Sequence, residues 1–127
     1  MLWIEKRRIF SAFMMFLLGA EIFYVSSIPG STRGAGFPLI PVIYHLSVFF
    51  LFPFFLFFSI KGKKEIKFGY AISALLISLI YAILDEFHQS FVPLRSPSSG
   101  DILTDLAGIS FSILISIFIS RKSTQAR

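Results

Sequence analysis

The sequence contains no cysteine, a single tryptophan and few charged residues: Asp, Glu, Lys and Arg together make up 15% of its 127 residues. The lack of cysteine excludes disulfide bonds and thiolate chemistry, although it names no compartment. The scarcity of charge leaves little with which to cover a water-soluble surface. Hydrophobic residues instead account for 55% of the chain, and 17 residues are phenylalanine. This composition is typical of an integral membrane protein.

Four continuous apolar stretches reach the length of about 20 residues that a helix needs to cross a hydrocarbon core of about 30 Å. They lie near residues 9–28, 42–60, 68–87 and 102–120. The first could also be read as a signal peptide, but it is longer than the usual hydrophobic region of about 7 to 15 residues, and Glu21 interrupts it. The apolar runs do not alternate with period 2, which argues against a β-barrel. The sequence therefore predicts an all-α fold, a bundle of four transmembrane helices in one domain over residues 1–127.

The basic residues are distributed unevenly around these stretches. Ten of the 12 lysines and arginines precede 9–28, separate 42–60 from 68–87, or follow 102–120, while Arg33 and Arg95 lie at the other end. Because short basic loops stay on the cytoplasmic side, we expect a multi-pass plasma membrane protein with both termini in the cytoplasm. The net charge of +5 is then a topology signal, helped by anionic headgroups. It gives no reason to expect a nucleic-acid partner, because no folded module presents these residues together.

Most of the acidic residues and both histidines fall at the opposite end of the predicted bundle. At 1.5 Å per residue, His45 lies about 5 Å inside the start of its helix, and Glu21 lies about 18 Å along the first helix, a little past the midplane. Ionisable side chains in a membrane span usually face the bundle interior or a wet cavity, so they indicate a functional site. The residues that we assign to this site are His45, Asp85, Glu86, His88, Gln89, Arg95, Asp101 and Asp105.

Helical spacing groups several of these residues. Asp85, His88 and Gln89 are related by i, i+3 and i+4, so they are expected on one face of the third helix. Asp101 and Asp105 share a face of the fourth in the same way. The short connection between the two helices predicts antiparallel neighbours. Asp101 is a candidate N-cap of the fourth helix, where a carboxylate would accept backbone N–H bonds.

Several stretches together resemble the VanZ-like family of small polytopic membrane proteins. The most specific is Asp85 to Ser96, which reads DEFHQSFVPLRS; Tyr24 to Gly30, His45, and Asp101 followed by Gly108 add to it. The resemblance covers most of the chain. It implies a role in the bacterial cell envelope and in resistance to glycopeptide antibiotics such as teicoplanin, and it implies no particular biochemical activity.

The chain differs from the family pattern at two places. Pro41 and Val42 stand where the family usually has an Asp-Lys pair ahead of the second-helix histidine, so no role of that pair can be carried over. Asp105 stands where the family tends to have Asn. This substitution adds an acidic group to an acidic cluster, so that either a proton is shared there or a cation is held nearby.

Three kinds of chemistry could use the predicted site. The histidines and carboxylates are ligand types for zinc or another divalent ion, but no metal-binding motif such as H-E-x-x-H occurs. His88 could act as a base oriented by Asp85 or Glu86, with Arg95 holding a phosphate of a lipid-linked substrate. The site could instead bind a headgroup, a cell-wall precursor or an amphiphilic drug without catalysis, or its charges could only hold helices together.

The sequence favours a VanZ-like protein that binds or modifies an envelope component through this polar site. The expected partners are the lipid bilayer and a lipid-linked or amphiphilic small molecule at the outer leaflet, with a homo-oligomer possible and neither cofactor nor metal assigned. Two alternatives remain: a small four-helix transporter that uses Glu21, and a structural membrane protein. The small residues of 102–120, including Gly108, Ser112 and Ser116, predict a closely packed helix.

Overall fold

The computed structural model describes residues 3–30 and 39–126, and within these ranges every regular element is a helix. A short helix, α1 (Trp3–Lys6), precedes four long ones: α2 (Arg8–Ser26), α3 (Leu39–Lys61), α4 (Phe68–Gln89) and α5 (Ser99–Gln125). All four long helices have the length and apolar composition to cross a membrane. The prediction of an all-α polytopic fold is therefore confirmed. The connection that contains Arg33 lies outside the described residues.

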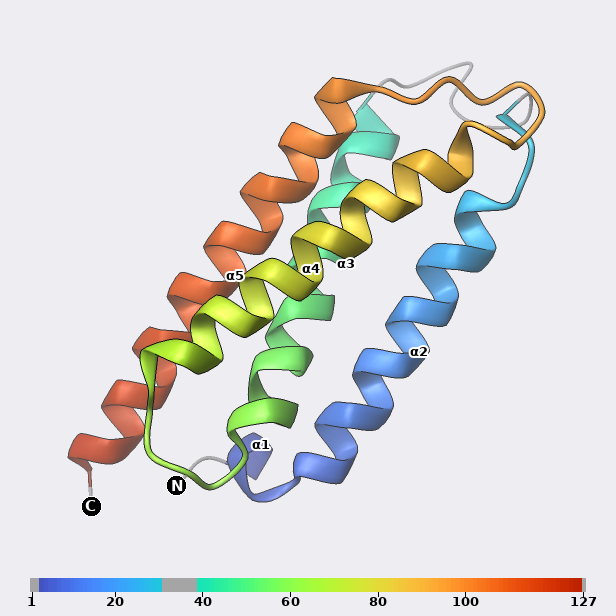
Figure 1. Cartoon of the computed structure of the whole chain (residues 1–127). Helices are drawn as coiled ribbons and strands as arrows, with labels where there is room; N and C mark the ends of the chain where they lie inside the picture. The colour runs from blue at the N-terminus through green and yellow to red at the C-terminus, as the bar shows by residue number, and fades with distance from the viewer. Residues whose placement is uncertain (1–2, 31–38, 127) are drawn as a thin grey trace.

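The four long helices form an up-and-down bundle in which α3 and α4 occupy the middle and α2 and α5 lie on either side (Figure 1). α3 packs against α2, α4 and α5, whereas α2 and α5 make no contact with each other within the described part of the chain. The N- and C-terminal ends lie at the same end of the bundle (Figure 1). The C-terminal ends of α2 and α4 and the beginnings of α3 and α5 meet at the opposite end.

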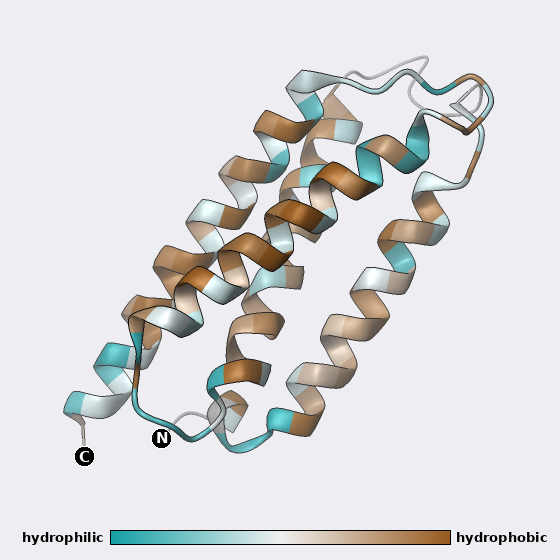
Figure 2. Ribbon diagram, in the orientation of Figure 1, coloured by the Kyte–Doolittle hydropathy of each residue, from teal (hydrophilic) through white to brown (hydrophobic). Residues whose placement is uncertain are grey.

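Large apolar side chains cover the outside of the bundle. Phe16 is 72% exposed and Phe118 is 64% exposed, on helices at opposite sides of the molecule. Figure 2 shows that hydrophobic residues predominate along the middle of the helices, while hydrophilic ones gather toward the two ends. Exposing so much apolar surface to water costs about 25 cal/mol per Å². The surface therefore suits a lipid bilayer, as the composition predicts.

The contact between α3 and α5 is the most extensive among the helix pairs, and small residues on α5 allow the two backbones to approach closely. Gly108, Ser112 and Ser116 follow one another at intervals of four residues on α5, and all three are buried. A Cβ atom at Gly108 would lie 3.0 Å from the carbonyl oxygen of Leu46 and 3.3 Å from the carbonyl carbon of Phe49, both on α3. The predicted close packing of this helix is thus confirmed, with α3 as its main partner.

The basic segments meet at the end of the bundle that carries the termini. Lys6, Arg8, Lys61, Lys63 and Lys64 line one cavity there, although they come from two separate segments of the chain. The Arg8 Nε also donates a hydrogen bond of 2.7 Å to the carbonyl oxygen of Ser59. This end carries the excess of basic residues, and the polar residues assigned to the site lie at the other end.

The helices differ from their predicted bounds mainly at the ends. α3 begins three residues earlier than predicted, and α5 begins at Ser99 and continues to Gln125, because polar residues can extend a helix beyond its apolar span. The early start of α5 overturns the expectation that Asp101 caps it. The N-cap is Ser98, whose hydroxyl accepts a hydrogen bond of 3.2 Å from the backbone N–H of Gly100. Asp101 lies inside the first turn instead.

Candidate functional site

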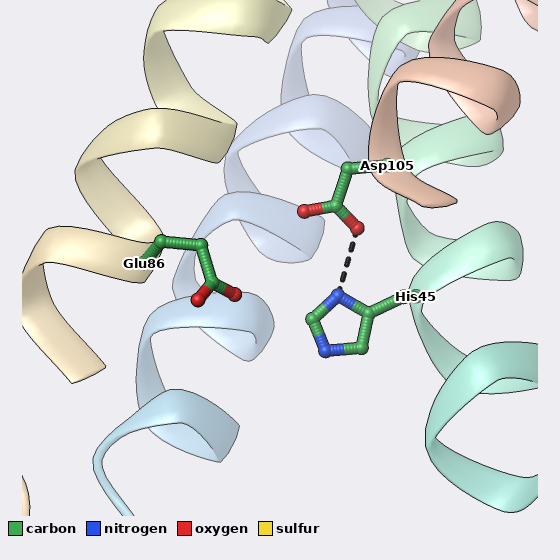
Figure 3. Close-up of side chains that lie close together, drawn as sticks. All are labelled: His45, Glu86 and Asp105. Carbon is green, nitrogen blue, oxygen red and sulfur yellow. Dashed lines mark hydrogen bonds and ion pairs between the residues drawn. The ribbon is translucent and has the colours of Figure 1, made fainter. Parts of the chain in front are cut away.

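Three helices bring His45, Glu86 and Asp105 to one point in the interior of the bundle. His45 comes from α3, Glu86 from α4 and Asp105 from α5, and Figure 3 shows the three side chains directed toward one another. One potential ligand atom from each lies within 4.8 Å of the other two. The residues one helical turn deeper on the same faces have no exposed surface: Phe49, Ala82 and Ile109. Buried apolar side chains therefore lie directly below the trio in the bundle interior.

Two carboxylate oxygens of this trio have no hydrogen-bond partner among the described residues. The Nδ1 of His45 lies 2.7 Å from Oδ1 of Asp105, a buried hydrogen bond and ion pair. Glu86 accepts a hydrogen bond of 3.0 Å at Oε2 from the backbone N–H of Ser98. The Oε1 of Glu86 and the Oδ2 of Asp105 are buried and have no hydrogen-bond partner among the described residues. Such atoms are rare in folded proteins and need an explanation.

A second polar network lies beside the trio, on the side of α4 that faces α2. The hydroxyl of Ser26 donates to Oδ1 of Asp85. The side-chain amide of Gln89 donates to Oδ2 of Asp85 at 3.0 Å and to the hydroxyl of Ser26 at 3.2 Å. Asp85 and Gln89 thus interact across one helical turn, as their spacing predicts. All three side chains are buried.

Arg95 joins this network to the end of α2. Its Nη1 donates to Oε1 of Gln89 at 2.9 Å, its Nη2 to the carbonyl oxygen of Val25 at 3.0 Å and its Nε to the carbonyl oxygen of Ile28 at 3.2 Å. The last carbonyls of a helix have no partner within the helix and carry partial negative charge, which a guanidinium satisfies. Arg95 therefore fixes the C-terminal end of α2 to the segment that follows α4.

The same two segments touch at Gly30 and Leu94. The backbone N–H of Gly30 donates to the carbonyl oxygen of Pro93 at 3.3 Å. A Cβ atom at Gly30 would overlap the carbonyl oxygen of Leu94, so only glycine fits there. Leu94 itself has a φ of 60°, in the left-handed region that a leucine seldom adopts. The two stretches that carried the family resemblance, around Ser26 and around Asp85, are therefore interlocked.

A cavity of about 540 Å³ opens above these contacts at the same end of the bundle. Its polar lining includes His45, Gln89, Arg95 and Asp101, so four of the eight predicted site residues face it. The other lining residues come from α2 and the segment after it, from the start of α3 and from the segment after α4: Val25, Gly30, Ile40, Pro41, Tyr44, Leu94 and Ser96. The cavity therefore joins the trio, through His45, to the second network, through Gln89 and Arg95.

The VanZ/LLP1 family model matches residues 8–120, which include α2, α3, α4, most of α5 and all of the residues of the trio, the second network and the cavity. The chain belongs to the VanZ/LLP1 family. Neither a curated protein nor a solved structure matches it. The family resemblance predicted from the short motifs is thus confirmed over nearly the whole chain.

In this VanZ-like chain, His88 does not take part in the trio or in the second network. Its Nε2 lies 3.0 Å from the hydroxyl of Ser27, and its ring stacks on that of Phe23 with 4.6 Å between centroids. Asp85 and Glu86 have other partners, so neither orients His88 as the hypothesis of a catalytic base requires. His88, three residues after Asp85, is turned toward the side of α2, whereas Gln89, four residues after Asp85, is turned inward.

Glu21, the acidic residue of the transporter hypothesis, is held within the VanZ-like bundle. The hydroxyl of Tyr44 on α3 lies 3.0 Å from both carboxylate oxygens of Glu21 on α2. Tyr44 precedes His45 and lines the cavity, while Glu21 does not line it. The hydroxyl of Tyr81 similarly donates to the carbonyl oxygen of Gly19, two residues before Glu21 on α2. Tyrosines of α3 and α4 thus satisfy the polar groups of the middle of α2.

Sequence reasoning did not assign Ser26, Ser27 or Tyr44 to the site. Ser26 binds Asp85, Ser27 contacts His88, and Tyr44 connects Glu21 to the cavity wall. The signal for the two serines was present, because they belong to one of the stretches that resemble the family. Tyr44 carries no such signal beyond its place next to His45.

Proposed function

We propose that this VanZ-like chain binds an amphiphilic molecule of the cell envelope, such as a lipid-linked precursor, and that it acts in glycopeptide resistance in this way. The cavity of about 540 Å³ is the observation that carries this proposal. Its volume is within the range of about 300 to 1,000 Å³ that is usual for small-molecule sites. The proposal assigns binding to the chain and leaves bond-making chemistry aside.

The lining of the cavity suits a molecule with both a polar and an apolar part. Apolar side chains at its wall, such as Ile40 and Leu94, are 60% and 75% exposed. Asp101, His45 and Gln89 offer charged or hydrogen-bonding groups to a headgroup. A lipid-like molecule could therefore place its chain along the apolar outside of the helices and its headgroup among the polar residues.

The expected orientation of the chain in the membrane determines the leaflet at which the cavity lies. The cavity lies at the end of the bundle opposite the basic segments and the termini. Because short basic segments stay in the cytoplasm, the proposal places the cavity at the outer leaflet of the plasma membrane. In this proposal the envelope component enters the cavity from that leaflet.

Arg95 has a supporting role in this proposal. Its guanidinium is hydrogen-bonded to two backbone carbonyl oxygens of the end of α2 and to Gln89, which holds the cavity wall in shape. It is therefore proposed to build the site rather than to grip a phosphate. The second network then serves the binding function by keeping α2 and α4 in register.

The test compares two serines that differ in their relation to the cavity. Ser96 and Ser99 are both exposed, but only Ser96 lines the cavity. We expect the wild-type chain to raise the teicoplanin resistance of a susceptible bacterium, and we expect Ser96→Phe to fill part of the cavity and to abolish that rise. Ser99→Phe is expected to leave that rise intact. The measurement is the minimal inhibitory concentration, with membrane accumulation of each variant determined by immunoblotting.

A second variant tests the polar part of the lining. Asp101→Asn keeps the shape of the side chain and removes its charge, so it should reduce the resistance without reducing accumulation. If Ser96→Phe and Asp101→Asn both confer as much resistance as the wild type at equal accumulation, the cavity is not the site of action. If Glu21→Gln abolishes both the resistance and the efflux of a dye, the result favours the transporter instead.

A further inference from the structure

We propose that His45, Glu86 and Asp105 form a binding site for one divalent transition-metal ion, of the zinc class, in the wall of the cavity. The proposal goes beyond amphiphile binding and does not depend on it. It rests on the geometry of the three side chains, on their burial and on two carboxylate oxygens that have no other partner among the described residues.

The three side chains are close enough to share an ion. Their candidate ligand atoms all lie within 4.8 Å of one another. Ligands at about 2.1 Å from a tetrahedral zinc ion stand about 3.4 Å apart. Closing the site therefore requires side-chain movements on the order of 1 Å, which rotamer adjustments of Glu86 can supply. No helix has to move.

The charge of the site is the second argument. Asp105 is 0% exposed, Glu86 is 3% exposed and His45 is 6% exposed, which makes this a buried acidic cluster. Two carboxylates in a poorly solvated interior repel each other, and buried charges are normally paired or coordinate a metal. A divalent cation neutralises both carboxylates together. The hydrogen bond to His45 can neutralise only Asp105, and it leaves Glu86 with the backbone N–H of Ser98 alone.

The unpartnered oxygens point to the same ligand. The Oε1 of Glu86 and the Oδ2 of Asp105 are buried without a donor among the described residues, and both carboxylates are directed into the space between the three helices (Figure 3). The Nδ1 of His45 lies 2.7 Å from Asp105, so an ion shared by the three side chains would replace this hydrogen bond and bind Nδ1.

The donor set selects the class of ion. One imidazole nitrogen with carboxylate oxygens suits zinc, manganese or iron, whereas magnesium and calcium prefer sites made of oxygen alone. His45 also lines the cavity, so an ion held there has a path from the outside and a position that faces the cavity. Such an open position would let the ion hold an anionic group of a bound molecule.

The experiment measures metal binding by the purified chain in detergent, with an affinity tag that contains no histidine. The protein is stripped with EDTA and dialysed against Zn²⁺, and elemental analysis is expected to give one zinc ion per chain. Co²⁺ provides a second readout, because its visible absorption spectrum reports a low-coordinate nitrogen and oxygen site. The chain contributes no thiolate to this signal, because it has no cysteine.

His88 supplies the matched control, since it lies at the same end of the bundle, near Ser27 and Phe23, outside the trio. We expect His45→Gln and Asp105→Asn to weaken zinc binding by at least about tenfold, because replacing a ligand costs no less than removing a hydrogen-bonding partner of a ligand. His88→Gln should bind zinc like the wild type. All variants are compared at equal monodispersity in size-exclusion chromatography.

Either of two results would overturn the proposal. Wild-type protein that takes up no stoichiometric zinc and gives no Co²⁺ spectrum would show that His45 and Asp105 form only an ion pair. Equal affinity of His45→Gln and His88→Gln for zinc would place any bound metal elsewhere. Because this assay uses the metal alone, it is independent of the resistance assay with Ser96→Phe, and the two proposals can fail separately.

Discussion

The hydroxyl of Ser26 donates a hydrogen bond to Asp85, so that the C-terminal ends of α2 and α4 are held together below the cavity. Asp85 also accepts from the amide of Gln89, and both of these partners are buried. One carboxylate therefore satisfies two polar groups from two helices. The stability of this end of the bundle should depend on it.

Asp85→Ala is expected to lower the free energy of unfolding by about 1 to 3 kcal/mol, because it leaves the buried Ser26 hydroxyl without its acceptor and removes one of the two acceptors of the Gln89 amide. Thermal unfolding in detergent, followed by circular dichroism, measures the change. Asp101→Ala is the control, since Asp101 is only half-buried. Equal stability of the two variants would mean that the Ser26 hydrogen bond contributes nothing.

Gly30→Ala should separate the segment after α2 from the segment after α4, because its Cβ atom would overlap the carbonyl oxygen of Leu94. The backbone cannot move away easily, and we expect a loss of stability of about 1 to 3 kcal/mol together with loss of the cavity. Gly69→Ala is the matched control, because a Cβ atom there meets nothing within 4 Å. A Gly30→Ala protein as stable as Gly69→Ala would show that these segments are not in contact.

Gly108→Ala tests the α3–α5 interface in the middle of the bundle. The added methyl group would press on backbone atoms of Leu46 and Phe49, and overpacking of this kind costs about 1 to 3 kcal/mol. Alanine has the higher helix propensity, by about 1 kcal/mol, so the substitution would otherwise stabilise α5. Gly69→Ala has the same gain in helix propensity but makes no new contact, because Gly69 lies in α4 and a Cβ atom there meets nothing within 4 Å. A melting temperature of Gly108→Ala at or above that of Gly69→Ala would contradict the close packing.

The membrane spans could be predicted because their signal is local. Apolar runs of sufficient length predict helices that cross a bilayer, and small residues such as Gly108 predict close packing. The interaction of Asp85 with Gln89 follows in the same way from the spacing of one helical turn. In each case the information lies within one helix. The bounds were less accurate, because polar turns such as the one beginning at Ser99 lie beyond the apolar signal.

The partners between helices could not be predicted, because they depend on how each helix is rotated about its axis. The sequence places His45, Asp105 and His88 at one level, but it does not show that His45 faces Asp105 while His88 faces Ser27. The contact between Gly30 and Leu94 depends on irregular backbone, for which no periodicity exists. Residue types and depth therefore identified the region of the site, and the structure was needed to divide it into two networks and a cavity.

The absence of cysteine from the chain allows its orientation in the membrane to be measured directly. Ser90→Cys places a thiol on the exposed segment after α4, near the cavity, and Lys64→Cys places one on the exposed segment between α3 and α4. If the basic segments lie in the cytoplasm, a membrane-impermeant maleimide added to intact cells should label Ser90→Cys and spare Lys64→Cys until the cells are lysed. Gel mobility after reaction with a polymer-linked maleimide measures both. The reverse pattern would place the cavity in the cytoplasm, where an envelope component of the outer leaflet could not reach it.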